Sequence, residues 1–192
     1  MSGALSQSDQ NWNKGDSEKR VGEEDLQRME AFSAKGNFGI GFFQEPLMRN
    51  LRFVRYDKES GINPASLVLS FTVTKDLCND FETLHGGAQA TAVDLFTSIL
   101  LSYVHRVPSV TADLHVSCIS AAPLGSTVIC LCKADKHGGR LQFSSCDLYI
   151  VVTKGSAESE TRRILVAKGL HTKYVLKKRF KGFDGERQKS KL

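Results

Sequence analysis

The sequence has no long apolar run, and this absence excludes a large class of proteins. A helix that crosses a bilayer needs about 20 consecutive apolar residues, and no segment of this 192-residue chain approaches that length. The first twenty residues are rich in Ser, Asn, Gly, Lys and Glu, and they lack the apolar core of a secretory signal. We therefore expect a soluble protein without membrane insertion.

Cysteine is also scarce and irregularly placed. The chain has 5 cysteines, an odd number, with neither a CxxC pair nor the Cys/His spacing of a zinc site. We therefore expect reduced thiols and no bound metal. Cys130 and Cys132 share one face of an apolar strand segment, where we expect them to be small side chains of the core.

Positive charge is concentrated at one end of the chain. Residues 173–192 hold eight Lys or Arg against two acidic residues, whereas the formal net charge of the whole chain is +5. A basic tail with few aromatic residues is more typical of a solvated peptide than of a surface that binds nucleic acid. We expect no nucleic-acid partner.

The same tail ends in Ser190, Lys191 and Leu192. This tripeptide is the signal bound by the peroxisomal import receptor. The sequence therefore predicts that receptor as a partner, and a location in the peroxisome matrix or a related organelle.

The length and a hydrophobic content of 41% favour one folded domain with loose ends. We expect a mobile segment over residues 1–22, one domain over 23–176 and the basic tail over 177–192. Within the domain, residues 23–48 form a helical cover, because Leu26, Met29 and Phe32 follow a weak amphipathic pattern.

The remainder of the domain reads as strands around one long helix. Apolar periodicity predicts a helix over 86–103, and turn signals containing Pro or Gly separate the strands that follow it. The pattern predicts an α+β fold in which an antiparallel sheet of five or six strands wraps the helix. The strands are expected over 51–56 and 66–73 before the helix, and over 111–119, 127–134, 141–153 and 163–174 after it, as a meander.

The start of the long helix is the most informative segment. Gly86 and Gly87 stand where the backbone N–H groups have no intrahelical partners, so the Gly86 N–H could bind a carbonyl oxygen that becomes negative during attack. Asp94 follows two turns later as a candidate base. In the alternative interpretation, Asp94 is a solvated helix residue and the glycines only mark a tight turn.

The spacing of these groups has a consequence for assembly. Asp94 lies about 12 Å along the helix axis from Gly86, so one chain cannot easily bring both groups to one carbon atom. Two such helices packed antiparallel across a twofold axis would bring Asp94 of one subunit to Gly86 of the other. The sequence therefore favours a homodimer.

The segment 79–87, followed by Ala92, Val93 and Asp94, resembles the signature of hotdog-fold acyl-CoA thioesterases of the phenylacetyl-CoA thioesterase and thioesterase superfamily member 2 type. The likeness covers roughly residues 67–174. The resemblance implies that Asn79 and Gly86 polarise a thioester carbonyl, and that Asp94 and Thr111 of the partner subunit hold the attacking water. It also implies that His85 shapes the pocket, and that the dimers often pair again into tetramers.

Two positions depart from the family pattern. Glu82 stands where the family usually has a small residue, and its carboxylate either points into solvent or repels an anionic substrate; we favour solvent. Thr111 replaces a serine but keeps the hydroxyl.

His115 and His171 lie inside predicted strands, where a lone histidine is more often a core or interface side chain than a ligand.

The resemblance also implies where the nucleotide end of the substrate binds. Lysine and arginine side chains could pair with phosphates, and glycines would leave backbone N–H groups open. The expected substrate-binding residues are Gly87, Ser120, Lys136, His137, Gly138, Gly139, Arg140 and Tyr174.

The implied reaction needs no metal or redox cofactor, because coenzyme A is part of the substrate. The sequence has no G-x-S-x-G elbow, so the attack would use water directly or a transient anhydride on Asp94. Two alternatives stay open. One is an acyl-CoA binding module without hydrolysis; the other, a dehydratase or isomerase, is disfavoured because no Asp-x-x-x-x-His arrangement begins the helix.

Overall fold

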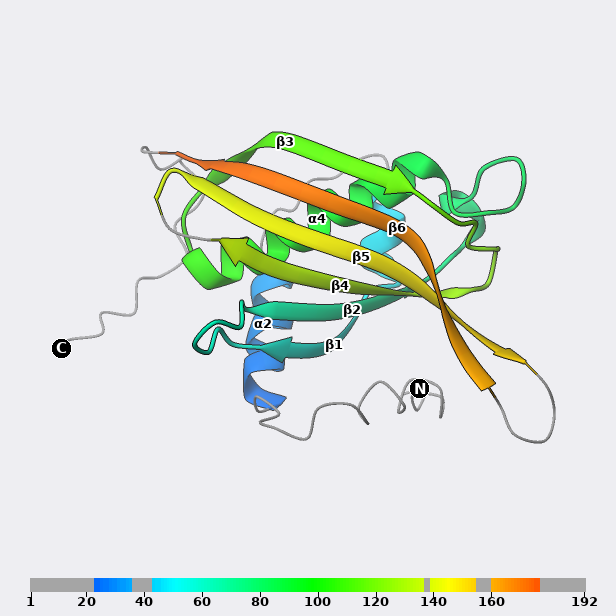
Figure 1. Cartoon of the computed structure of the whole chain (residues 1–192), viewed down its shortest axis with the longest axis horizontal. Coiled ribbons are helices and arrows are strands. Elements are labelled where there is room, and N and C mark those ends of the chain that lie inside the picture. Colours follow the sequence, from blue (N-terminus) through cyan, green and yellow to red (C-terminus); the bar gives the residue numbers. More distant parts are fainter. Residues whose placement is uncertain (1–22, 36–42, 137–138, 155–159, 177–192) are drawn as a thin grey trace.

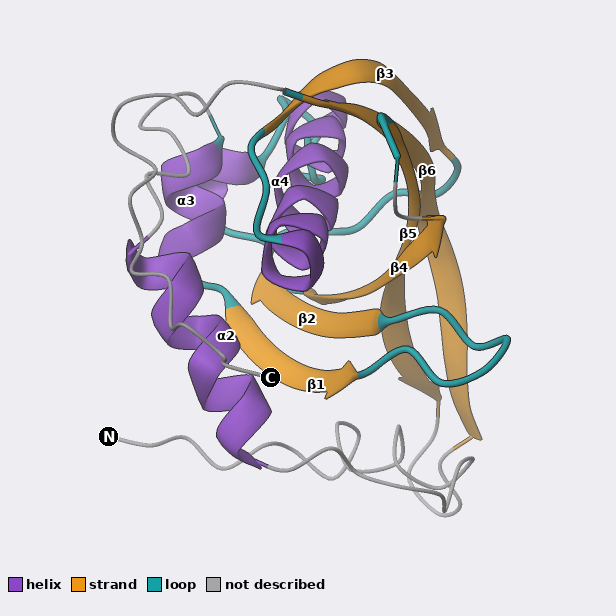
Figure 2. Ribbon diagram, turned by 90° about the vertical axis from the view of Figure 1, so that its left-hand side faces the viewer, coloured by secondary structure: helices purple, strands orange, loops and turns teal. Residues whose placement is uncertain are grey.

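The computed structural model describes residues 23–35, 43–136, 139–154 and 160–176. Six antiparallel strands form one curved sheet, and a long helix lies against its concave face (Figure 1, Figure 2). The predicted α+β hotdog fold is therefore confirmed. The elements are α2 (Glu23–Lys35), α3 (Gln44–Arg49), β1 (Arg52–Asp57), β2 (Ser66–Thr72), the short 3₁₀ helix η2 (Lys75–Leu77), α4 (Gly86–His105), β3 (Ser109–Cys118), β4 (Thr127–Lys136), β5 (Leu141–Lys154) and β6 (Glu160–Val175).

The order of the strands corrects one expectation. Strands β4, β5 and β6 form the predicted meander, but β3 does not pair with β4; the order is β1-β2-β4-β5-β6-β3. Helix α4 crosses the sheet, so the chain emerges at the far edge and β3 pairs with β6. The other edge of β3 has no partner among the described strands. Neighbours along the sequence were therefore a poor guide to pairing here.

Helix α4 is held at both ends by local geometry. His85 accepts a hydrogen bond from the Gly87 N–H, and Arg106 ends the helix in a left-handed conformation with φ 52°. Most of the helix surface is buried against the sheet and the N-terminal helices. One stripe remains half-buried, and it consists of Gly87, Thr91, Asp94, Ser98 and Ser102. These residues recur at helical spacing, so they share one face.

The helix and the sheet approach most closely at Gly169 of β6. A Cβ at this position would lie 2.4 Å from Cγ1 of Val93, which leaves no room for a side chain. Cys130, Cys132 and Cys146 are fully buried on the same concave face, as the alternation predicted for the first two. All five cysteines are free thiols.

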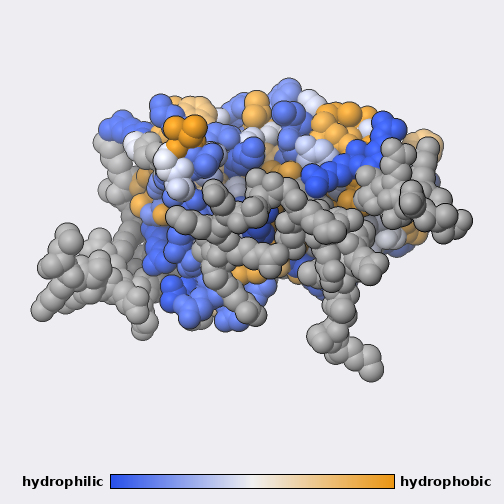
Figure 3. Space-filling view, turned by 60° about the horizontal axis from the view of Figure 1, so that its bottom comes forward, coloured by the Kyte–Doolittle hydropathy of each residue, from blue (hydrophilic) through white to orange (hydrophobic). Residues whose placement is uncertain are grey.

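The N-terminal helices close the side of α4 that the sheet leaves open (Figure 2). Met29 of α2 and Leu47 of α3 are fully buried, and the ring of Phe32 meets that of Tyr103 edge to face at 6.0 Å. Helix α2 and most of α3 lie within residues 23–48, where a helical cover was expected, although the apolar pattern pointed to α2 alone. In the described part of the face in Figure 3, hydrophobic residues form separate patches among hydrophilic ones.

Two of the expected segments, residues 1–22 and 177–192, lie outside the described residues. None of the helices within the described ranges combines the length and apolarity required to span a bilayer.

Candidate active site

The start of α4 offers an exposed backbone donor at Gly86. The imidazole Nδ1 of His85 accepts from the Gly87 N–H at 2.9 Å, and the His85 carbonyl accepts from the Gln89 N–H at 3.0 Å. No acceptor for the Gly86 N–H is found in the part of the chain that the structure describes. The helix dipole adds positive potential at this point. Gly86, rather than Gly87, is therefore the donor available to a ligand oxygen.

Close packing explains why Gly87 must lack a side chain. A Cβ at this position would lie 2.9 Å from the ring of Phe43 and 3.0 Å from Nδ1 of His85. The two rings stack with centroids 5.2 Å apart. Phe43 therefore holds the His85 imidazole in the orientation that caps the helix. Phe43 is a residue that the sequence did not single out, and the expected role of His85 in shaping a pocket stays a prediction.

Asn79 lies in the loop that leads into the helix. Its Oδ1 accepts from the Phe81 N–H at 3.0 Å, the Thr83 N–H at 3.2 Å and the Thr83 hydroxyl at 3.1 Å. Because three donors converge on Oδ1, the amide orientation is set, and Nδ2 is left to donate elsewhere. The loop is tied to the helix start because the His85 N–H donates to the Leu77 carbonyl at 2.8 Å.

Glu82 lies in the same loop, and its contacts show where its carboxylate points. Its backbone has φ 55°, the left-handed region where glycine is favoured, which explains why a small residue is usual there. Its carboxylate accepts from Lys75 Nζ at 2.9 Å, and both side chains are exposed. This hydrogen bond lowers the pKa of Glu82. The carboxylate therefore points into solvent, as favoured, and its charge is paired.

Asp94 and Thr111 come together in the middle of the helix. The Thr111 hydroxyl lies 3.2 Å from Oδ1 of Asp94, although the residues belong to α4 and β3. The Asp94 side chain is 38% exposed. The predicted pairing of the base with a hydroxyl is therefore present, and it occurs within one chain.

His171 of β6 joins this group, and it is buried, as expected for a histidine inside a strand. Its Nε2 lies 3.0 Å from the Thr111 hydroxyl and 3.3 Å from Oδ1 of Asp94, while Nδ1 lies 2.7 Å from the Thr97 hydroxyl. The alternation along β6 places His171 on the same face as Gly169, which was a usable signal. Its neighbours could not be read from the sequence, because they come from other elements.

Three contacts bear on the tautomer of this histidine. The Thr97 hydroxyl has one proton, which serves either the Val93 carbonyl at 2.6 Å or Nδ1 of His171 at 2.7 Å. Nε2 faces Oδ1 of Asp94 at 3.3 Å. Burial and then the Lys173 ammonium lower the pKa of His171 to about 4. The imidazole is neutral near pH 7.

Comparison with known proteins agrees with this geometry. A family model described as Thioesterase superfamily matches residues 81–154. Acyl-coenzyme A thioesterase 13 of Mus musculus is 31% identical over 113 residues, which are 58% of this chain and 74% of that protein. The chain belongs to the thioesterase superfamily.

Solved structures support the same assignment. The zebrafish thioesterase superfamily member 2 has a TM-score of 0.57 and 26% identity, over 77% of this chain and 95% of that one. The Mus musculus thioesterase superfamily member 2 has a TM-score of 0.58 over 78% and 96% of the two chains, and at 24% identity it shows the fold alone. The expected resemblance is therefore confirmed, and the protein is a thioesterase.

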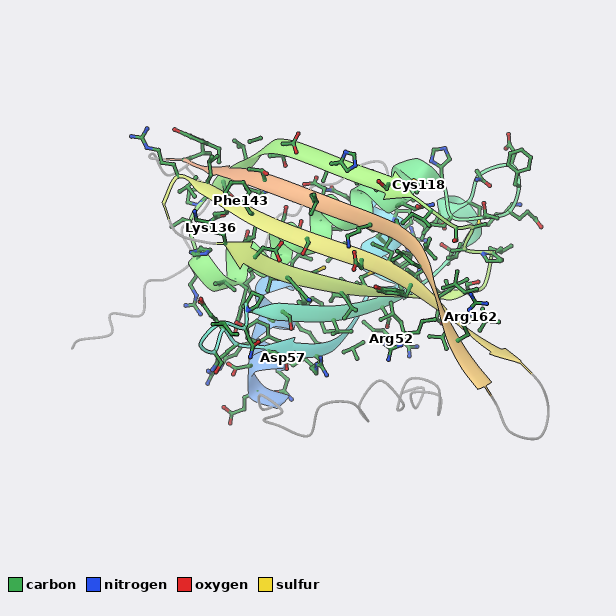
Figure 4. All side chains as sticks on the ribbon, in the orientation of Figure 1. Arg52, Asp57, Cys118, Lys136, Phe143 and Arg162 are labelled. Carbon is green, nitrogen blue, oxygen red and sulfur yellow. The ribbon has the colours of Figure 1, made fainter. Side chains whose placement is uncertain are left out.

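The residues expected at the nucleotide end of this thioesterase fall into two distant groups. Ser120 follows β3 near the start of α4, where its N–H donates to the Val166 carbonyl at 3.1 Å. Lys136, Gly139 and Arg140 are exposed at the β4–β5 turn, and Figure 4 places Lys136 at the opposite end of the molecule from Cys118. His137 and Gly138 lie outside the described residues.

Tyr174 and His115 lie on the convex face of the sheet, away from α4. Tyr174 pairs in register with Val110 and Leu141, and it is 36% exposed. His115 is exposed and contacts the Ser117 hydroxyl at 3.3 Å. His115 is therefore not a core side chain, and the alternative expectation of an interface side chain stays a prediction. In residues 23–35, 43–136, 139–154 and 160–176, no three His, Cys, Asp or Glu side chains gather in a way that could hold a metal ion.

Proposed function

We propose that this thioesterase hydrolyses a fatty or aryl acyl-CoA to the free acid and coenzyme A. The observation that carries the proposal is the Asp94–Thr111 pair beside His171, together with an unpaired Gly86 N–H on the same helix. The name of the acyl-coenzyme A thioesterase 13 relative supports the substrate class.

In the proposed reaction, Asp94 takes a proton from a water that the Thr111 hydroxyl orients, and the water oxygen bonds to the thioester carbon. The negative charge moves to the carbonyl oxygen, which accepts from the Gly86 N–H and Asn79 Nδ2. Collapse of this intermediate breaks the carbon–sulfur bond, and the thiolate takes the proton from Asp94. During these steps Oδ1 of Asp94 lies 3.3 Å from Nε2 of His171.

The site requires a second copy of the chain. Asp94 lies eight residues after Gly86, about 12 Å along the axis, so the base and the oxyanion donor of one chain cannot serve the same carbon atom. The half-buried stripe of α4 and the open edge of β3 lie beside Asp94 and offer a surface for a partner. An antiparallel arrangement would also bring Lys136 and Arg140 of one protomer toward the Gly86 end of the other.

The convex face of the sheet supports a further assembly into a dimer of dimers. Val110, Leu141, Phe143, Leu170 and Tyr174 are between 36% and 51% exposed on this face. Light scattering on the purified protein tests both assemblies. A monomer that retains activity would contradict the shared site.

Thiol release from short, medium, long and aryl acyl-CoAs tests the activity. We expect Asp94→Asn to lose about 10² to 10⁴ in rate, as for the removal of a general base. Asp113→Asn is the matched control, because Asp113 is an exposed aspartate on β3 that pairs with Thr172. Equal rates for the two variants would refute the proposed base.

Binding of acyl-CoA without turnover by the wild type would instead favour the non-hydrolytic module. A single turnover in ¹⁸O-labelled water would separate direct water attack from a transient anhydride on Asp94, because only the anhydride leaves label in the protein.

Peroxisomal location remains a proposal, because Ser190–Leu192 lies outside the described residues. A fluorescent protein fused upstream of the chain should enter peroxisomes and should stay in the cytosol when Leu192 is deleted. Cytosolic fluorescence from the intact fusion would refute the assigned location.

A further inference from the structure

Lys173 is a buried cation beside the proposed base. It lies on β6 two residues after His171, on the face that packs against α4, and it is only 7% exposed. Its Nζ donates to the Ser98 hydroxyl at 2.9 Å. Ser98 follows Asp94 by one helical turn, so the ammonium lies against the same stretch of helix as the carboxylate.

An ammonium in this environment needs a compensating charge. Burying an ion is unfavourable unless an opposite charge and hydrogen bonds offset the loss of water, and a serine hydroxyl supplies no charge. The groups that face Lys173 are Asp94 and Ser98 from α4, His171 from β6, Thr111 in register on β3 and Gln142 in register on β5. Among these, Asp94 is the anion and His171 is the titratable neutral group. Asp113 of β3 is a further carboxylate whose charge acts on His171 and raises its pKa.

We propose that Lys173 is a positioning residue whose buried ammonium lies against the helix segment that carries Asp94 and keeps the His171 imidazole neutral. The proposal rests on the function proposed above. A fixed positive charge disfavours a second cation nearby, so it keeps His171 neutral beside the proposed base. The electrostatics agree in direction, because Lys173 lowers the pKa of His171 while Asp94 raises that of Lys173.

The test removes this charge and follows two readouts. Lys173→Met keeps the length of the side chain, and Lys173→Gln also keeps an N–H donor for Ser98. In both variants we expect the acid limb of the kcat/KM profile to move up by about one pH unit, the usual effect of one nearby charge. The ring NMR signals of His171, followed from pH 8 down to pH 4, should also titrate at higher pH than in the wild type.

Two controls separate this role from a structural one. Lys168→Met removes the same charge from the same strand at an exposed position, and it should leave both readouts unchanged. Lys173→Arg keeps the charge and should bring the acid limb back toward the wild type. Thermal unfolding of every variant is measured beside these readouts, so that a loss of fold is separated from a loss of charge.

The proposal is overturned when the His171 titration and the acid limb in both neutral variants coincide with those of the wild type. A wild type that hydrolyses no acyl-CoA would refute the proposed function, and the His171 titration would still decide the role of the Lys173 charge. When Lys173→Met does not fold, Lys173→Gln decides the same question.

Discussion

The shared active site predicts that two inactive variants restore each other. Gly86→Pro removes only the backbone donor, because Gly86 is the first residue of α4, where proline is well tolerated. His85 has φ −60° and ψ 139°, values that suit a residue before proline. A Cβ at position 86 would meet only Cys118 Sγ, at 3.7 Å. Gly86→Ala keeps the donor and is the matched control.

We expect Gly86→Pro to lose about 10² to 10³ in kcat, the usual effect of removing one oxyanion donor. Mixed dimers of Gly86→Pro and Asp94→Asn then contain one site with both native groups and one site with neither. Random pairing of equal amounts makes half of the dimers mixed, so the mixture should recover about one quarter of the wild-type activity.

The assay requires dimers that have exchanged subunits, which co-expression with two different affinity tags provides. Thiol release is then measured on the doubly purified mixed dimers, where half of the sites should be intact. A mixture of Asp94→Asn with the Gly86→Pro, Asp94→Asn double variant should recover nothing. Mixed dimers of the single variants that stay as inactive as their parents would refute the reasoning that each site combines Gly86 and Asp94 of different chains.

Three further predictions concern stability. Gly169→Ala should lower the free energy of unfolding by about 1–3 kcal/mol through overpacking, and Val93→Ala should relieve part of this loss in a denaturant double-mutant cycle; additive effects would contradict the 2.4 Å approach. The pKa of His171 is depressed, so its contribution to stability is present above pH 6.5 and is lost as the pH falls to about 4, by up to about 3 kcal/mol. In chemical denaturation across this range, the free energy of unfolding should change less with pH for His171→Gln than for the control His115→Gln. Glu82→Gly should raise the melting temperature, because glycine adopts the φ of 55° without strain, and a lower value would refute this account.

Local patterns predicted the elements well. The helix predicted over 86–103 corresponds to α4, and all six strands lie within a few residues of their expected positions, because each pattern reflects one buried face. The motif around Gly86 and Asp94 indicated the reactive helix in the same way. Strand pairing was harder to predict from the sequence, because β3 pairs at the far edge of the sheet and not with β4 in the meander.

The contacts of His171 show what local sequence patterns cannot predict. Asp94 and His171 are separated by 77 positions in the chain, yet Nε2 lies 3.3 Å from Oδ1. The contact exists because β3 and β6 pair at the edge of the sheet and α4 packs across them at Gly169. Nothing local to either residue encodes that approach.

The amino-acid sequence alone therefore determined the long helix, its glycine start, the lone aspartate and the alternation of the strands, since these follow from backbone and side-chain preferences over a few residues. The family resemblance already paired Thr111 with Asp94. Only the tertiary structure decided that His171 lies against both and that Lys173 is buried one helical turn further on, and that the Gly86 N–H is exposed without a partner. Such neighbours are set by how the sheet curves around the helix, a property of the packed chain as a whole.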